Sequence, residues 1–312
     1  MNKCSNTTFR EFHILGFTTS KMGQLTLFVV VLTMYFFTIL GNLTIITLIS
    51  LMSMLHTPMY FFLCNLCVVD VTYVSTTLPK FLIITITQDN RISFDDCITQ
   101  LYFFTFCVAC DIFVLTTMAY DRYVAICKPL QYTMIMNKKV CITVALICWL
   151  ISALNSLLLT LLTSVLSFCN SQNINHFFCD LKTLTLLSSS DTRSREILML
   201  IQDFLLAFVP FSLIIISYMK IIKTILNIHS SEGRLKVFSS CTSHLTTVIM
   251  FYGPIIFIYL KPQSDHSKEQ DNLLSMLYVA FVPMLNPFVY SLRNKDIKDA
   301  IRKLTLFNRP LL

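Results

Sequence analysis

The sequence predicts an all-α membrane protein, a seven-transmembrane helix bundle with a short amphipathic helix after the seventh span. Of its 312 residues, 55% are apolar and only 13% are charged, whereas a soluble domain carries about 25% charged residues. The apolar residues also gather in long uninterrupted blocks, and the basic residues gather between alternate blocks. A large soluble helical protein would not leave such blocks without charge.

Four stretches contain no Asp, Glu, Lys or Arg: 22–69, 140–179, 237–260 and 272–292. A helix of roughly 20 apolar residues crosses a bilayer, so each stretch holds at least one span. The first holds two, because Pro58 interrupts it and suits the first turn of a new helix. The predicted spans are 25–51, 58–85, 97–123, 140–165, 197–222, 236–260 and 272–292.

The distribution of basic residues predicts the orientation of the chain. The segments around 122–139, 220–236 and 293–312 carry 14 basic residues against four acids, a net charge of +10, while the remainder of the chain carries −3. Because positive loops stay in the cytoplasm, these segments are expected inside and the N-terminus outside. The basic balance therefore reflects topology and gives no reason to invoke nucleic acid.

The first 20 residues lack a continuous apolar stretch, so we expect no signal peptide and assign the insertion signal to the first span. Asn6-Thr7-Thr8 is a glycosylation sequon on the predicted outer side. Most of the twelve cysteines lie inside apolar helices, where they act as small hydrophobes. We expect no metal site at these cysteines.

Motifs occur in order along these spans. They are Gly41-Asn42, Leu55-His56-Thr57-Pro58-Met59-Tyr60, Met118-Ala119-Tyr120-Asp121-Arg122-Tyr123, Ser217-Tyr218, Lys236–Leu245 and Pro283–Asn294. The Asp-Arg-Tyr and Asn-Pro-x-x-Tyr parts resemble the rhodopsin-like G-protein-coupled receptors. The longer versions resemble vertebrate olfactory (odorant) receptors of class II, the tetrapod type, over nearly the whole chain.

The resemblance implies three segments: an extracellular N-terminus at 1–24, a seven-transmembrane receptor domain at 25–292, and a cytoplasmic amphipathic helix and tail at 293–312. It also implies a disulfide between Cys97 and Cys179 that holds the second outer loop. The chain departs from the family at Ser189, where a cysteine is usual, so Cys169 is expected to lack a partner.

The resemblance further implies a switch at the inner ends of the helices. On activation Arg122 would turn inward and contact a G protein α subunit. The residues assigned to coupling and switching are Asp121, Arg122, Tyr123, Tyr218, Asn286, Pro287 and Tyr290. Pro287 breaks the helical hydrogen-bond ladder, so the freed carbonyl is expected to find a polar partner nearby.

Asp70 and Asp111 are acids deep within the second and third spans, and such residues are functional candidates. With Asn42 and Asn286 they are expected to form a buried polar cluster. Two interpretations stay open: a sodium site at Asp70 and Asp111, as in the wider superfamily, or a structural network that shares a proton.

The resemblance places an odorant pocket in the outer half, between spans three, five, six and seven. Its predicted lining is Phe104, Thr105, Val108, Ala109, Met199, Gln202, Asp203, Leu206, Tyr252, Ile255, Ile256 and Tyr259. The three- and four-residue steps within this set put its members on shared helix faces. The mostly apolar lining suits a small, hydrophobic, neutral ligand, and Asp203 could still meet a cation or a hydroxyl donor.

These observations predict an odorant receptor that activates a stimulatory, olfactory G protein and raises cAMP, in the plasma membrane of olfactory neuron cilia. Its expected partners are an odorant, the heterotrimeric G protein and membrane lipids, with no cofactor. A non-olfactory receptor for another small ligand is the alternative, and a transporter is remote because the halves show no internal repeat. The sequence contains no nucleophile–base set and no phosphate-binding loop, so we do not expect an enzyme.

Overall fold

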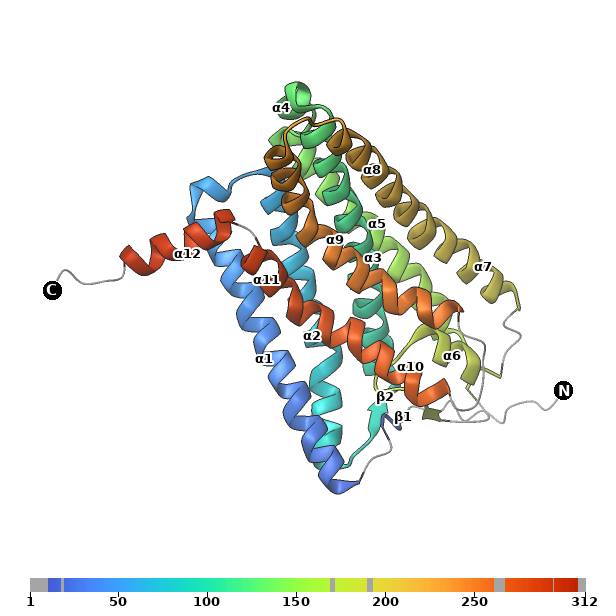
Figure 1. Ribbon diagram of the computed structural model, residues 1–312. Helices are drawn as coiled ribbons and strands as arrows, with labels where there is room; N and C mark the ends of the chain where they lie inside the picture. The colour runs from blue at the N-terminus through green and yellow to red at the C-terminus, as the bar shows by residue number, and fades with distance from the viewer. Residues whose placement is uncertain are drawn as a thin grey trace.

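The computed structural model describes residues 11–17, 20–168, 172–189, 193–260, 267–293 and 295–307. Long helices lie side by side and form one bundle, with the short strands at one end and α12 at the other (Figure 1). The membrane-length helices are α1 (Lys21–Leu51), α2 (Pro58–Thr87), α3 (Phe94–Cys127) and α5 (Lys138–Ser164). Sequence-predicted spans one to four agree with these bounds within a few residues.

The fifth predicted span is built from α7 (Arg193–Asp203), a π-helical turn (Phe204–Phe208) and α8 (Val209–Leu226). The sixth is α9 (Ser231–Leu260). The seventh combines α10 (Ser267–Met276), a π-helical turn (Leu277–Phe281) and α11 (Val282–Arg293).

By length and composition, six helical segments of the described chain can cross a membrane, and a shorter apolar helix at Cys241–Phe257 lies within α9. Together they make the predicted seven-helix bundle. The fold class therefore agrees with the prediction from sequence.

Both π-helical turns lie just before a proline, at Pro210 and at Pro283. A proline has no N–H to donate and its ring crowds the preceding turn, so a locally widened helix accommodates it. Such a turn changes the direction in which the following side chains point.

The end of the bundle that the sequence predicts to be cytoplasmic is called the inner end, and the opposite end the outer end. The inner end carries the shorter helices α4 (Tyr132–Ile135) and α12 (Lys295–Phe307). Along α12, Ile297 and Ala300 are buried, and Tyr60 donates a hydrogen bond to Asp296 at 2.9 Å. The predicted amphipathic helix is therefore present and packs against the start of α2. Leu304 is also part of α12, but its side chain lies outside the described set.

A small three-stranded sheet at the outer end was not predicted from the sequence. Strand β1 (Glu11–Ile14) pairs antiparallel with β2 (Arg91–Ser93) and parallel with β3 (Asn173–Ile174), in the order β2-β1-β3. Phe12 and Ile14 point inward, and each is 1% exposed. The sheet joins the N-terminal segment to the first and second outer loops, and the short helix α6 (Leu181–Leu187) follows it.

Candidate ligand and signalling sites

The inner end of α3 holds the acid–arginine motif. Asp121 is 1% exposed, and its carboxylate accepts a hydrogen bond of 2.8 Å from the hydroxyl of Tyr132 in α4. Burial and the neighbouring Asp121 carboxylate raise the pKa of Tyr132 well above its usual range, so the phenol remains a donor. The inner loop is therefore hydrogen-bonded to the acid of the motif, and no residue pattern predicts this contact.

Tyr123, the third residue of that motif, lies beneath two lysines from different helices. The ammonium of Lys220 in α8 is 5.3 Å from its ring centroid, and that of Lys128 is 6.0 Å away. Aromatic faces attract cations at such distances. The ring therefore brings two positive charges together beside the motif.

A buried hydrogen-bond chain connects three helices above this motif. The hydroxyl of Tyr218 in α8 lies 2.7 Å from Nδ1 of His244 in α9, and Nε2 of His244 lies 3.0 Å from the main-chain oxygen of Leu115 in α3. His244 is completely buried. If Nε2 carries the proton, it donates to Leu115 and Nδ1 accepts from Tyr218, so a neutral imidazole satisfies both contacts.

His244 is a site residue that sequence reasoning did not single out. It lies in the Lys236–Leu245 motif, but a lone histidine has no periodic or charge signal that would reveal its partners. Tyr218 was predicted to take part in the switch, and the structure places it against this histidine.

Of the four residues predicted to form a polar cluster, the structure joins Asp70 and Asn286 by a hydrogen bond in the middle of the bundle. Asn286 donates to Oδ2 of Asp70 at 2.9 Å, and both residues are buried. Asn42 donates to the main-chain oxygen of Pro283 at 3.2 Å. Pro287 provides no N–H for that oxygen, so Asn42 supplies the polar partner expected for the freed carbonyl.

Asp111 is 3% exposed, and its Oδ1 has no hydrogen-bond partner among the described residues. Buried polar atoms normally find partners, so Asp111 remains a candidate for the predicted sodium ion or shared proton. Within the described part of the chain, no group of three or more His, Cys, Asp or Glu side chains gathers as a metal site. Sodium binding at Asp70 and Asp111 stays a prediction.

The predicted pocket residues of α3 and α9 lie around buried aromatic rings. Phe104 stacks on Tyr73 with centroids 5.5 Å apart, and Tyr252 lies 4.6 Å from Phe211. Ala109 is buried, Val108 and Ile255 are half-buried, and Ile256 is 38% exposed. Thr105 donates to its own helix at Leu101, which leaves its oxygen as an acceptor.

The hydroxyl of Tyr252 is buried and has no hydrogen-bond partner in the described structure. It is therefore available to a polar group of a ligand. Among the residues assigned to the pocket, this hydroxyl is the polar group best placed to hydrogen-bond to a ligand.

Two predicted pocket residues on the fifth span contact α5. Met199 borders a small cavity with Leu159 and Thr163, and Gln202 hydrogen-bonds to Asn155. Leu206 is half-buried. Ligand contacts by these residues stay predictions, and the side chains of Asp203 and Tyr259 lie outside the described set.

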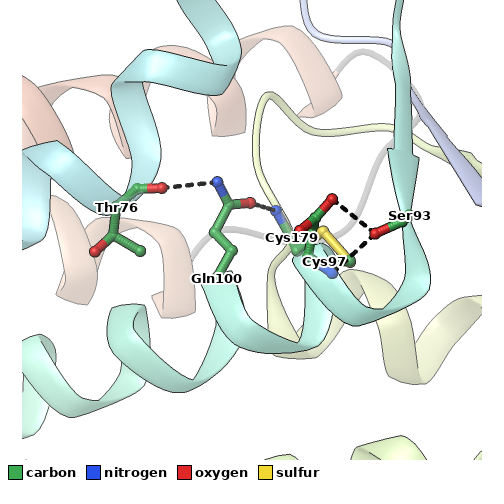
Figure 2. The surroundings of a disulfide bond; sticks show 6 residues. Thr76, Ser93, Cys97, Gln100 and Cys179 are labelled. Atoms are coloured by element: carbon green, nitrogen blue, oxygen red, sulfur yellow. Dashed lines mark hydrogen bonds between the residues drawn. A yellow bond between two sulfur atoms is a disulfide. The ribbon is translucent and has the colours of Figure 1, made fainter.

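The outer end is closed by the predicted disulfide between Cys97 and Cys179. Gln100 accepts from the N–H of Cys179 at 2.8 Å and donates to the oxygen of Thr76 at 3.0 Å, so one side chain connects α2, α3 and the loop (Figure 2). His176, in the same loop, lies 3.2 Å from Oγ of Ser275. Burial lowers the pKa of His176 to about 4, so its ring is neutral at pH 7. Asn6 and Cys169 lie outside the described residues.

A protein-family profile described as olfactory receptor matches residues 31–308. The chain belongs to the olfactory receptor family. It is 46% identical over 304 residues to human (Homo sapiens) olfactory receptor 1F1, covering 97% of each chain. It is also 46% identical to olfactory receptor 5AR1 of Mus musculus, with 97% of this chain and 98% of the relative covered.

Olfactory receptor 1 of Rattus norvegicus is 44% identical, with 97% of each chain covered. The motifs at Asp121-Arg122, Lys236–Leu245 and Asn286-Pro287 therefore belong to an olfactory receptor. Membership in this family, together with the apolar helices, makes the chain a multi-pass membrane protein of a receptor family.

Proposed function

We propose that this olfactory receptor binds a small, mostly hydrophobic odorant between the outer halves of spans three, five, six and seven, which are formed by α3, α7, α9 and α10. Bound odorant then activates a stimulatory, olfactory-type G protein and raises cAMP. The observation that carries this proposal is the family match, which extends from the first span to α12. On this proposal the N-terminus is extracellular and the protein acts at the plasma membrane of sensory cilia.

The chemistry of the proposed pocket supports a ligand with one polar group. Phe104 and Tyr252 contribute aromatic surface, and the hydroxyl of Tyr252 lacks a protein partner. An apolar pocket with a few placed polar groups is the usual form of a small-molecule site. An alcohol, aldehyde or ketone odorant can bury its carbon skeleton and still hydrogen-bond to Tyr252.

The contacts of Tyr218 and His244 support the proposed signalling step. They join α8, α9 and α3 directly above Asp121 and Arg122, and the nearby inner ends of the helices are rich in lysine. Movement of α9 away from α3 would break the His244–Leu115 contact and open the inner face. A cationic inner face with Arg122 then suits the C-terminal helix of a G protein α subunit.

The proposed function is tested by measuring cAMP in transfected cells across an odorant panel. Arg122→Ala, compared with wild type at equal surface level, is expected to lose the response while odorant binding persists. Retention of a full cAMP response by Arg122→Ala would show that the switch assignment is wrong.

The pocket assignment is tested by removing single polar atoms. Tyr252→Phe is expected to lower the potency of oxygenated odorants roughly threefold to tenfold, because one hydrogen bond is lost. Tyr35→Phe is the control, because that hydroxyl lies on α1 near Ser75. If Tyr252→Phe, Thr105→Ala and Tyr259→Ala all leave every potency unchanged, the odorant binds elsewhere.

A further inference from the structure

A groove of about 340 Å³ lies between the outer halves of α2 and α3, apart from the proposed odorant pocket. Ligand sites commonly occupy roughly 300–1,000 Å³, so the groove is large enough for a small polar group. Its lining includes Thr76, Pro79 and Lys80 from α2, and Asp96, Gln100 and Phe103 from α3. None of these residues is part of the proposed pocket or switch.

Two opposite charges line this groove at the same level. The hydrogen bond from Gln100 to the oxygen of Thr76 sets the register of the two helices, which run in opposite directions. Lys80 and Asp96 each lie one turn further out along their own helix, since residues four apart share a helix face. They are therefore level with each other across the groove.

The two charges do not neutralise each other. No ion pair within 4.0 Å joins Lys80 to Asp96 among the contacts of the described residues. One oxygen of Asp96 accepts from Ser93 at 2.7 Å, while its second oxygen remains for another donor. A separated cation and anion that line one groove suit a ligand carrying both charges.

The groove is accessible from the lipid side. Phe103 is 41% exposed at its inner edge, and Ile83, one turn after Lys80 on α2, is 53% exposed. Both helices are long and apolar enough to cross a membrane. Lys80 lies about two turns, roughly 10 Å, before the outer end of α2, so its ammonium can reach the headgroup region by extending outward.

We propose that this groove binds the zwitterionic headgroup of an outer-leaflet phospholipid, with the phosphate at Lys80 and the ammonium at Asp96. A purely anionic headgroup would meet the Asp96 carboxylate, and a purely cationic amphiphile would meet Lys80. The exposed face of Phe103 and Ile83 takes the first part of an acyl chain, because it adds apolar surface that water would otherwise cover.

A hydrogen-bonded side chain connects the groove to the second outer loop. Gln100 lines the groove. It also accepts a hydrogen bond from the N–H of Cys179, the loop residue of the disulfide (Figure 2). A bound headgroup therefore lies one side chain away from the loop that covers the bundle. Lipid composition would act on loop stability through this residue.

The test uses the purified full chain in detergent and counts bound lipids by native mass spectrometry. Dioleoylphosphatidylcholine is compared with anionic dioleoylphosphatidylglycerol at equal concentration, and soluble phosphocholine is the competitor without acyl chains. One tightly retained phosphatidylcholine is expected. A preference for phosphatidylglycerol, or equal competition by soluble phosphocholine, would overturn the proposal.

Charge-removing variants test whether the lipid binds in this groove. Lys80→Gln and Asp96→Asn are each expected to reduce phosphatidylcholine retention roughly fivefold, the effect of losing one partly exposed ion pair. Lys80→Arg should retain it, which separates loss of charge from loss of fold. Asp95→Asn is the matched control, because Asp95 is exposed on the same helix turn and does not line the groove. Wild-type retention in both charge-removing variants would show that the lipid binds elsewhere.

Discussion

The side-chain amide of Asn42 in α1 donates to the main-chain oxygen of Pro283 in the seventh span, across a separation of 241 positions. In a regular helix this oxygen would accept from the N–H of residue 287, but that residue is a proline. The contact explains why a buried asparagine, 0% exposed, lies in an otherwise apolar helix. It also gives the first prediction.

Asn42→Ala leaves the oxygen of Pro283 buried without that donor. The free energy of unfolding should fall by about 1–3 kcal/mol, the usual penalty for an unsatisfied buried group. Thermal unfolding in detergent measures the change. Thr44→Ala on the exposed face of α1 is the control and should change stability little. Equal stability of the two variants would contradict this account of Asn42.

Gly41, the neighbour of Asn42, allows α1 to approach Pro287. A Cβ built on Gly41 would lie 3.0 Å from two ring atoms of Pro287, which is tighter than most Cβ contacts in proteins. Gly41→Ala is therefore expected to destabilise the bundle by about 1–3 kcal/mol through overpacking. Gly253→Ala is the matched control, because a Cβ there meets nothing within 4 Å and alanine favours a helix. Thermal unfolding of the two variants side by side checks the prediction, which fails if Gly41→Ala is the more stable.

Tyr218 and His244 should behave as one unit in a double-mutant cycle. Tyr218→Phe removes the hydroxyl that meets Nδ1, and His244→Phe removes both histidine contacts. The double variant should be less destabilised than the sum of the single variants, with a coupling of about 0.5–3 kcal/mol, because the groups are in contact. Chemical or thermal unfolding measures the change in the free energy of unfolding for each single variant and for the double variant. Strict additivity would show that the hydrogen bond contributes nothing to stability.

The outer loop should lose stability in acid because of His176. Its pKa of about 4 in the folded state lies below the unfolded value of roughly 6.5, so the unfolded chain binds more protons between these values. Stability attributable to this ring is present above about pH 6.5 and is lost as pH falls toward 4. The nearby carboxylates of Asp180 and Asp271 partly offset the effect.

His176→Gln cannot take up that proton, so its melting temperature should fall less than that of wild type between pH 7.5 and pH 5. His13→Gln serves as the control on β1, because it is another outer histidine. Parallel pH curves for wild type and His176→Gln would contradict the assignment.

The sequence predicts the spans well because hydropathy and charge are local properties. The charge-free stretches and Pro58 are visible without any tertiary information, and the helices begin and end within a few residues of the predicted positions. The outer sheet was not predictable in this way. Strand β1 contains Glu11 and His13, and it exists because β2 and β3 arrive on either side of it.

The same contrast between local properties and tertiary contacts applies to the candidate site residues. Asp121, Asp70 and Asn286 stand out because polar residues in apolar segments are costly. His244 and Tyr132 do not stand out, because their importance lies in partners on other helices. The contacts of Met199 and Gln202 with α5 likewise depend on how α7 packs against that helix, which no residue pattern reports.

The strand order β2-β1-β3 constrains how the receptor is assembled during synthesis. β1 is translated first, yet one of its edges waits for Asn173 and Ile174, which follow the fourth span. The outer cap therefore cannot close until four helices have left the ribosome and entered the bilayer. Until then Phe12 and Ile14 lack part of their cover, so a delay in inserting α5 exposes the beginning of the chain to chaperones and quality control.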